Sequence, residues 1–164
     1  MKNLPDFESV YSSHYAKVFR LCKGYTGGDE ALAEDLAQDA FIKVYTHLRT
    51  FKGASQIGTW VYRIAVNTCL LYLRKNAKQS TKSLSFDVSD DLADASTIKE
   101  QQLQALYSCI HKLKDDDKTI ILLTLEKMPQ KEIAAFTGIT HEAIRVKIHR
   151  IKQQLIQCTQ DGRI

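Results

Sequence analysis

Basic and polar side chains near the C-terminus follow the spacing of one helix face, a pattern suited to reading DNA. Between residues 141 and 155 they alternate with apolar residues that recur every three or four positions, so a helix here would bury one face and expose the other. On the exposed face Arg145 could read guanine and Glu142 could accept a hydrogen bond from the amino group of cytosine. Lys147, Arg150 and Lys152 suit phosphate contacts, which set register. The candidate DNA-contacting residues are Thr140, His141, Glu142, Arg145, Val146, His149 and Arg150.

The residues before this segment predict that it is the second helix of a helix-turn-helix. Pro129 suits a first helical turn, and Ala134 is small where a second helix must approach closely. Gly138 follows four residues later, where a left-handed backbone is favourable only for glycine. Thr140 is an expected N-cap for the next helix. From this motif alone, an ordinary helical hairpin with a solvated basic face is the alternative.

A second group of candidate residues lies in the loop FKGASQIGTW and in the helix VYRIAVNTCLLYLRK that follows it. Aromatic, amide, basic and small residues together suit single-stranded DNA, whose unstacked bases are held by aromatic faces, backbone groups and cations. Phe51, Trp60 and Tyr62 are expected in the core more than on a stacking surface, and Arg63 and Asn67 are the better candidates for contacts. The full candidate set is Lys52, Ser55, Gln56, Ile57, Arg63, Asn67 and Arg74.

Helices are expected to position both groups of residues. The 164 residues include only seven glycines and two prolines, and apolar residues recur at helical spacing over 7–23, over 29–48 and after Gly58, which predicts an all-α fold. Helical spacing resumes from Leu103 and is expected to break at the acidic triplet Asp115–Asp117.

Composition divides the chain into two helical domains, 1–76 and 99–164, and a flexible linker, 77–98, in which polar residues dominate. The first domain has ten Lys and Arg against seven Asp and Glu, the second has eleven against eight, and the linker has two against four. Two basic domains that flank an acidic linker suit an anionic partner.

Other chemistries have little support in the sequence. The four cysteines, at 22, 69, 109 and 158, form no CxxC pair, and no histidine stands at metal-ligand spacing, so we expect reduced, structural cysteines, no metal and no cofactor. An enzyme is disfavoured because HExxH, phosphate-binding glycine loops and nucleophile elbows are absent. The sequence has no signal-peptide core and no membrane-spanning run, which predicts a cytoplasmic protein that does not insert into a membrane.

Taken in order, three segments of the chain resemble the extracytoplasmic-function (ECF) sigma factors, the minimal branch of the bacterial sigma-70 family. They are AEDLAQDAFIKVY, FKGASQIGTWVYRIAVNTCLLYLRK and EIAAFTGITHEAIRVKIHRIKQQL, and the resemblance covers residues 7–157. It implies a non-catalytic subunit that binds core RNA polymerase, directs it to promoter DNA and helps to melt the start region.

The resemblance also implies a role for each segment. The stretch Glu34–Tyr45 would bind the β′ clamp, and the β flap is a second implied contact on the polymerase. The middle segment would read the minus-ten element and capture a flipped base, and the last two helices would read the minus-thirty-five element. An anti-sigma factor, which in some cases is membrane-bound, is a further implied partner. The interface candidates on the first segment are Asp35, Gln38, Asp39 and Lys43.

Two departures from the family pattern bear on the minus-ten preference. Leu71 stands where many relatives carry an acidic residue, and Ile57 and Gly58 stand where an aromatic and a polar or basic residue are frequent. A different class of protein, a dimeric repressor or activator that uses the same helix-turn-helix, is the rival hypothesis. It predicts specific duplex binding without polymerase.

Overall fold

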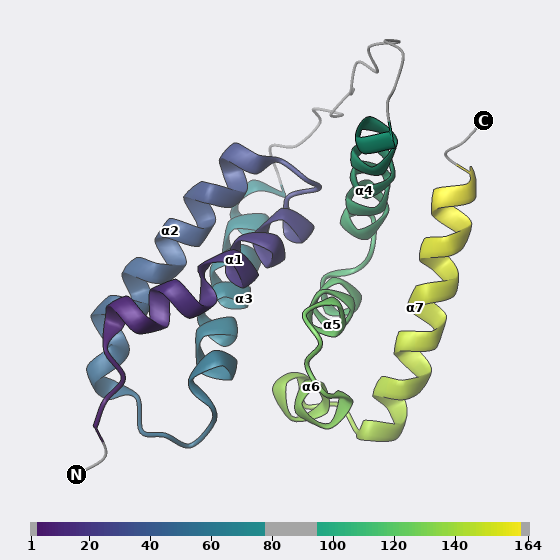
Figure 1. Ribbon diagram of the computed structural model, residues 1–164. Helices are drawn as coiled ribbons and strands as arrows, with labels where there is room; N and C mark the ends of the chain where they lie inside the picture. The colour runs from purple at the N-terminus through teal and green to yellow at the C-terminus, as the bar shows by residue number, and fades with distance from the viewer. Residues whose placement is uncertain (1–2, 78–94, 162–164) are drawn as a thin grey trace.

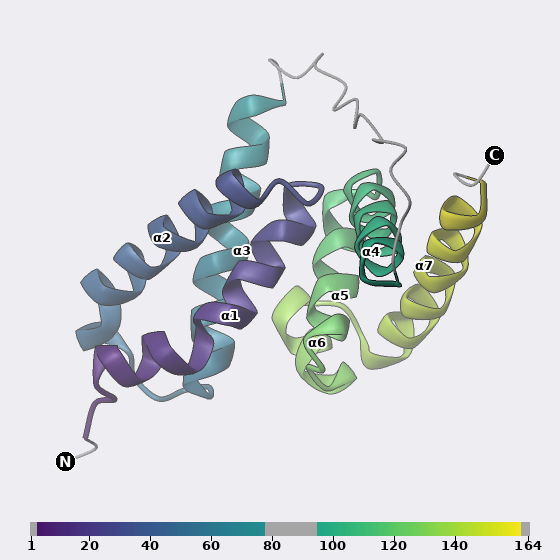
Figure 2. The ribbon, with the colours of Figure 1, turned by 45° about the horizontal axis from the view of Figure 1, so that its top comes forward.

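The computed structural model describes residues 3–77 and 95–161, and over these residues the chain is helical and contains no strand. Helices α1 to α3 form one bundle and α4 to α7 form a second bundle beside it (Figure 1; turned in Figure 2). The all-α prediction is confirmed. The helices are α1 (Phe7–Tyr25), α2 (Glu30–His47), α3 (Ile57–Asn76), α4 (Ala95–His111), α5 (Asp115–Leu125), α6 (Gln130–Thr137) and α7 (His141–Asp161), with a short 3-10 helix, η1 (Leu48–Thr50), after α2.

The predicted linker, 77–98, falls mostly on residues outside the described ranges. Residues 95–98 belong to α4, so helical structure begins before Leu103, where the periodicity first becomes clear. The domain boundaries therefore stay a prediction.

The ends of the helices follow from local side-chain chemistry. Asp29 caps α2, because its carboxylate accepts a hydrogen bond from the backbone N–H of Leu32 at 3.1 Å. The acidic triplet Asp115–Asp117 forms the first turn of α5, so the prediction that the helix breaks there is wrong. Carboxylates are favourable at a helix N-terminus, where the backbone N–H groups carry partial positive charge, and the break lies one step earlier, at residues 112–114.

The loop expected over residues 50–58 is also shorter in the structure. It spans residues 51–56, and Ile57 and Gly58 already belong to α3. Gly58 lies close to α1, since a Cβ atom there would be 3.1 Å from Nε2 of His14.

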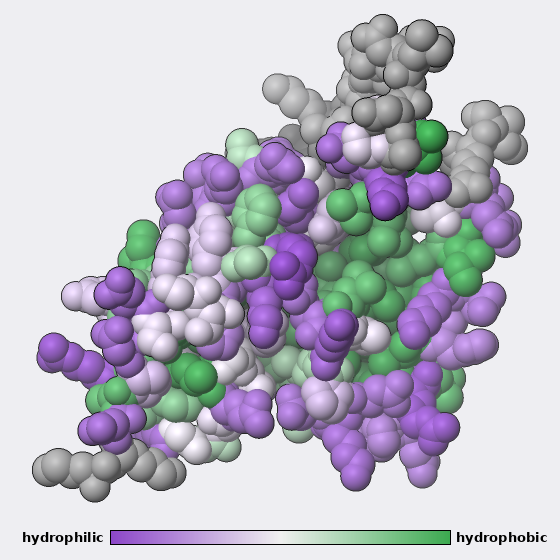
Figure 3. Space-filling view, viewed as in Figure 1, coloured by the Kyte–Doolittle hydropathy of each residue, from purple (hydrophilic) through white to green (hydrophobic). Residues whose placement is uncertain are grey.

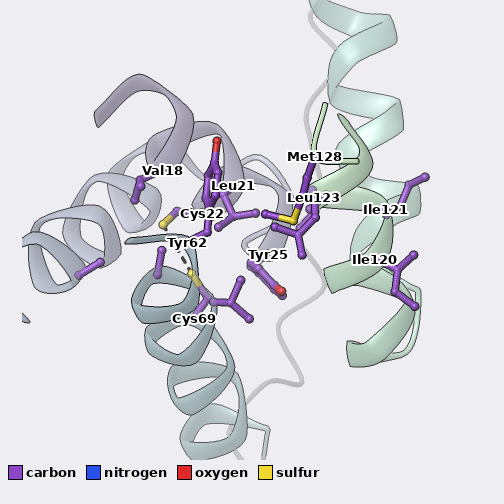
Figure 4. Packing of buried hydrophobic residues seen from close by; sticks show 14 of the residues in the cluster. Val18, Leu21, Cys22, Tyr25, Tyr62, Cys69, Ile120, Ile121, Leu123 and Met128 are labelled. Carbon is purple, nitrogen blue, oxygen red and sulfur yellow. Dashed lines mark hydrogen bonds between the residues drawn. The ribbon is translucent and has the colours of Figure 1, made fainter. Parts of the chain in front are cut away.

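Helix α5 is buried on more than one side and joins the two bundles. Residues 117–123 are all buried, as expected of a helix that is surrounded by protein. Leu21 of α1 faces Leu123 of α5 and Met128 beyond it, while Ile120 and Ile121 lie on the side of α5 away from α1 (Figure 4). The contact between the bundles therefore runs along α1 and α5, and α4 packs against α1 as well.

Polar contacts accompany this packing. Arg20 of α1 donates two hydrogen bonds of 2.9 Å to the carboxylate of Glu126, at the end of α5, and this interaction raises the pKa of Arg20. The hydroxyl groups of Tyr25 and Thr119 are hydrogen-bonded to each other, and burial raises the pKa of the Tyr25 phenol. Gln104 of α4 donates to the backbone carbonyl of Gly27 at 3.0 Å.

The four cysteines form two spatial pairs, one in each bundle. Cys22 and Cys69 are buried thiols whose sulfur atoms lie 3.5 Å apart, whereas Cys109 of α4 and Cys158 of α7 form a disulfide. The prediction of reduced cysteines is therefore wrong for Cys109 and Cys158, which lie 49 positions apart. Only the packing of α4 against α7 brings them together. Within residues 3–77 and 95–161, no three His, Cys, Asp or Glu side chains are grouped to hold a metal ion, and no helix could span a membrane.

Candidate nucleic-acid interface

Helices α6 and α7 form the predicted helix-turn-helix. Gly138 ends α6 with φ at +73°, and its N–H donates to the carbonyl of Ala134 at 2.9 Å, a left-handed cap that suits glycine. Thr140 caps α7, because its hydroxyl oxygen accepts from the N–H of Ala143 at 3.2 Å. Pro129 is the N-cap of α6, one position before the first turn in which it was expected. The side chains that α7 buries are those predicted, Ile144, Ile148, Ile151 and Leu155.

The opposite side of α7 carries the candidate DNA contacts. Val146 is 70% exposed and lies among these polar candidates, where its methyl groups are open to contact with a partner. Hydrophilic side chains gather over α6 and the beginning of α7 (Figure 3). Thr140, Glu142, Arg145, Val146, His149 and Arg150 are exposed, and His141 is half-buried.

Asp117 lies beneath this surface, and the sequence pattern gave no reason to select it as a functional residue. Its side chain is buried, and its carboxylate oxygens form ion pairs with Nζ of Lys147 at 3.7 Å and with Nη2 of Arg150 at 3.4 Å. Two of the cations expected to contact phosphates, in the N-terminal half of α7, are thus paired with one carboxylate of α5. Only the tertiary packing of α5 on α7 reveals this role, since the sequence marks Asp117 merely as part of an acidic triplet.

In the first bundle, the candidate residues lie on the loop before α3 and along the outer side of α3. Phe51 and Trp60 pack together with ring centroids 5.3 Å apart, Trp60 also contacts the core, and Tyr62 is buried. The prediction that these aromatic residues belong mainly to the core is therefore confirmed for Tyr62, whereas Trp60 is half-buried at the edge of the core. Ile57 is half-buried against the same core. The exposed candidates are Lys52, Ser55, Gln56, Arg63, Asn67 and Arg74.

A hollow between α2 and α3 lies beside these residues. It has a volume of about 350 Å³, and Trp60, Asn67, Thr68 and Lys43 are among the residues that line it. Lys43 is half-buried here and donates to the hydroxyl of Thr68 at 3.2 Å. The hollow thus offers an aromatic ring, an amide and a cation within one small depression.

Arg63 is the one candidate that contacts the other bundle. Its guanidinium lies 4.3 Å from the ring centroid of Phe136 in α6 and donates to the backbone carbonyl of Phe136 at 3.4 Å. The stacking is a cation–π interaction. In this arrangement of the bundles, part of the Arg63 side chain is already engaged by protein.

Helix α2 presents three of its four candidates to solvent, whereas the fourth, Lys43, is half-buried against α3. The exposed candidates are Asp35, Gln38 and Asp39. Ile42 and Tyr45 of the same helix are 63% and 67% exposed, although neither is among the residues predicted from the sequence. Two exposed apolar side chains near three polar ones are typical of a protein–protein interface.

Comparison with known proteins identifies the family. The family model for Sigma-70 region 2 matches residues 10–79, and that for Sigma-70 region 4 matches residues 103–155. The ECF RNA polymerase sigma-E factor of Escherichia coli K12 is 31% identical over 134 residues, which cover 74% of this chain and 70% of that protein. This chain belongs to the ECF sigma factors of the sigma-70 family.

Other relatives agree with this membership. The ECF RNA polymerase sigma-E factor of Haemophilus influenzae is 29% identical over 162 residues, which cover 91% of this chain and 85% of that protein. The fold resembles that of the sigma factor RpoE from Bartonella quintana, solved in complex with the anti-sigma factor NepR, with a TM-score of 0.72, 19% identity and coverage of 94% of this chain and 97% of that one. A sigma factor directs promoter-specific initiation of transcription, so the rival hypothesis of a self-sufficient dimeric regulator is set aside.

Proposed function

We propose that this sigma factor reads the minus-thirty-five element with the exposed side of α7. The observation that carries the proposal is the separation of the two sides of α7, four buried apolar residues on one and a mostly polar and basic surface around Val146 on the other. Arg145 and Glu142 lie in its first two turns, the part of a second helix that enters the major groove. Lys147 and Arg150 contact phosphates when they leave Asp117.

In the same proposal, α3 and the loop before it bind the melted minus-ten element. Support comes from the exposed Lys52, Gln56 and Asn67 and from the hollow that Asn67 and Trp60 line. A hollow with an aromatic wall and an amide group suits an unstacked base. Melting then needs no nucleotide hydrolysis, because captured bases offset the free energy of opening the duplex.

Core RNA polymerase binds the outer side of α2 through Asp35, Gln38, Asp39 and the nearby Ile42 and Tyr45. The second bundle offers a further surface for the polymerase flap or for an anti-sigma factor. Hydrophobic surface lies between α4 and α7 (Figure 3), and Leu103 of α4 and Ile156 of α7 are about half exposed. We place the protein in the cytoplasm, without catalytic activity or cofactor of its own.

Run-off transcription with purified core polymerase tests this function. Core polymerase and a library of promoter fragments are incubated with and without the chain, and start sites are mapped. We expect initiation at a subset of fragments that share two elements at fixed spacing. Binding of the chain alone to the same duplexes should be weak, since each domain makes few contacts and polymerase fixes their separation.

Two results would contradict the proposal. One is a start-site map that the chain leaves unchanged. The other is tight, specific duplex binding by the chain without polymerase, which would restore the hypothesis of an independent regulator.

A further inference from the structure

We propose that Cys109 and Cys158 are a reversible thiol–disulfide pair, a redox modification site that controls how firmly α4 is held on α7. The proposal goes beyond promoter recognition and rests on the packing of the second bundle. Cys109 lies in the last turn of α4 and Cys158 in the last turns of α7. The disulfide is therefore a covalent bond between two helices that otherwise meet only by packing.

Both sulfur-bearing residues line a groove that small reagents can enter. The groove has a volume of about 690 Å³ and lies between α7 and the segment that joins α4 to α5. Cys109 is 6% exposed and Cys158 is half-buried, so Cys158 is the sulfur that solvent reaches first. Four cations line the groove, Lys112, Lys114, Lys147 and Arg150, against two carboxylates, Asp116 and Asp117. This excess of positive charge favours the thiolate form that reacts.

The other two cysteines provide an internal comparison. Cys22 and Cys69 lie together in the core of the first bundle, with no exposed surface at either residue. The Cys69 thiol donates to the sulfur of Cys22, and this contact together with burial raises the pKa of Cys69. A protonated, enclosed thiol reacts slowly, so the same chain holds one accessible pair and one inert pair.

The chemistry is exchange with a low-molecular-weight disulfide. The Cys158 thiolate attacks one sulfur of the reagent R–S–S–R, forms a mixed disulfide and releases one thiolate RS⁻. The Cys109 thiolate then attacks the Cys158 sulfur and releases the second RS⁻. The two protein thiols lose two electrons and two protons, and the reagent gains both to become two R–SH. Excess R–SH reverses the two steps.

Reduction is expected to loosen one specific part of the molecule. Helix α4 packs against α7 on one side and α1 on the other, and the disulfide is the one covalent cross-link among the described residues. Without it, α4 and the last turns of α7 open more often, because a closed loop no longer restricts their separation. Both cysteines lie in the second bundle, and α4 packs on α1, so the effect should be smallest in α2 and α3.

Redox titration of the full chain tests the proposal. The protein is equilibrated in mixtures of oxidised and reduced glutathione, its free thiols are alkylated in denaturant, and each cysteine is quantified by peptide mass spectrometry. We expect Cys109 and Cys158 to lose label together as the oxidised fraction rises, while Cys22 and Cys69 stay labelled. Amide hydrogen exchange on the same samples should be about tenfold or more faster in α4 and in residues 151–161 of the reduced chain.

Two variants complete the test. Cys158→Ser should exchange like the reduced chain in every buffer, and Cys22→Ala, the matched control in the other bundle, should keep the difference between the two redox states. The wild-type comparison needs no variant, so it stands even where a substitution disturbs folding. Full labelling of Cys109 and Cys158 at every glutathione ratio would overturn the proposal, as would equal exchange of α4 in the oxidised and reduced chains.

Discussion

Replacing Gly24 by alanine tests the packing of the two bundles against each other. Gly24 is buried near the end of α1, and a Cβ atom there would overlap the side chain of Leu122, with three Leu122 carbons at or within 3.0 Å. Leu122 is itself only 3% exposed, so its side chain has little room to move. A single added methyl group thus acts as a wedge between α1 and α5.

Two opposing effects set the magnitude. Overpacking of a well-packed contact is unfavourable by about 1–3 kcal/mol, and glycine to alanine in a helix is favourable by up to about 1 kcal/mol. The helix effect operates whether or not the bundles touch, whereas the overlap exists only when they do. We therefore expect Gly24→Ala to shift the balance from packed to separated bundles by about 5- to 150-fold, while α1 itself becomes slightly more stable.

Energy transfer between dyes on the outer ends of α2 and α7 reports this balance, together with the radius of gyration from small-angle scattering. Gly24→Ala should lower transfer and raise the radius of gyration. Gly58→Ala is the matched control, because its Cβ would meet only His14 of the same bundle, at 3.1 Å. An unchanged inter-dye distance together with a higher melting temperature for Gly24→Ala would refute the reasoning, since only the helix effect would then remain.

Three further predictions concern the second bundle. Arg145→Ala should reduce the discrimination between the preferred base pair and the others at one upstream position by about 1–3 kcal/mol, measured in promoter-binding assays with the holoenzyme. Equal weakening on every promoter sequence would make Arg145 a phosphate contact instead. Asp117→Asn should remove the free-energy cost of separating Lys147 and Arg150 from this carboxylate, so DNA binding should tighten in anisotropy titrations while the slope of log affinity against log salt stays the same; a slope that steepens by about 1–2 would mean that the two cations stay with Asp117 in the wild-type complex. Cys158→Ser should lower the free energy of unfolding in oxidising buffer by at most about 4 kcal/mol, the loop-closure value for cysteines 49 positions apart. Chemical denaturation measures this, and the same loss in reducing buffer would assign the effect to packing.

Most of the helices could be predicted from local sequence patterns. Helical periodicity and the caps at Asp29, Gly138 and Thr140 depend on residues within a few positions of one another, so the sequence predicts the helix-turn-helix and the buried side of α7. The run Ile120–Leu123 contains four consecutive apolar residues, which indicates a helix buried on more than one side. It does not indicate which surface covers α5.

Contacts between segments that are distant in the sequence could not be predicted from such local patterns. The disulfide between Cys109 and Cys158 and the ion pairs of Asp117 with α7 depend on how α4 and α5 pack against α7. The sequence around a cysteine or a charged residue does not indicate which distant segment it will contact. Arg63 was chosen for its position on the exposed side of α3, and it does lie there. That Phe136 of the other bundle covers part of it follows only from the relative placement of the bundles.

Arg63 is both a candidate contact for the minus-ten element and a contact between the bundles, so the strength of the packing between the bundles bears on the proposed function. The Arg20–Glu126 pair has a guanidinium that is 51% exposed, so it contributes about 1 kcal/mol or less. Complete burial of Leu122 and Leu123 in α5 contributes about 1.5–3 kcal/mol for each side chain, and the contact with α1 accounts for part of it. Apolar contact rather than charge therefore holds the bundles together, and raising the salt concentration should not open them. A partner opens the molecule only if it covers the apolar side of α5 or gains an equal free energy elsewhere, which polymerase and two promoter elements bound at once can supply.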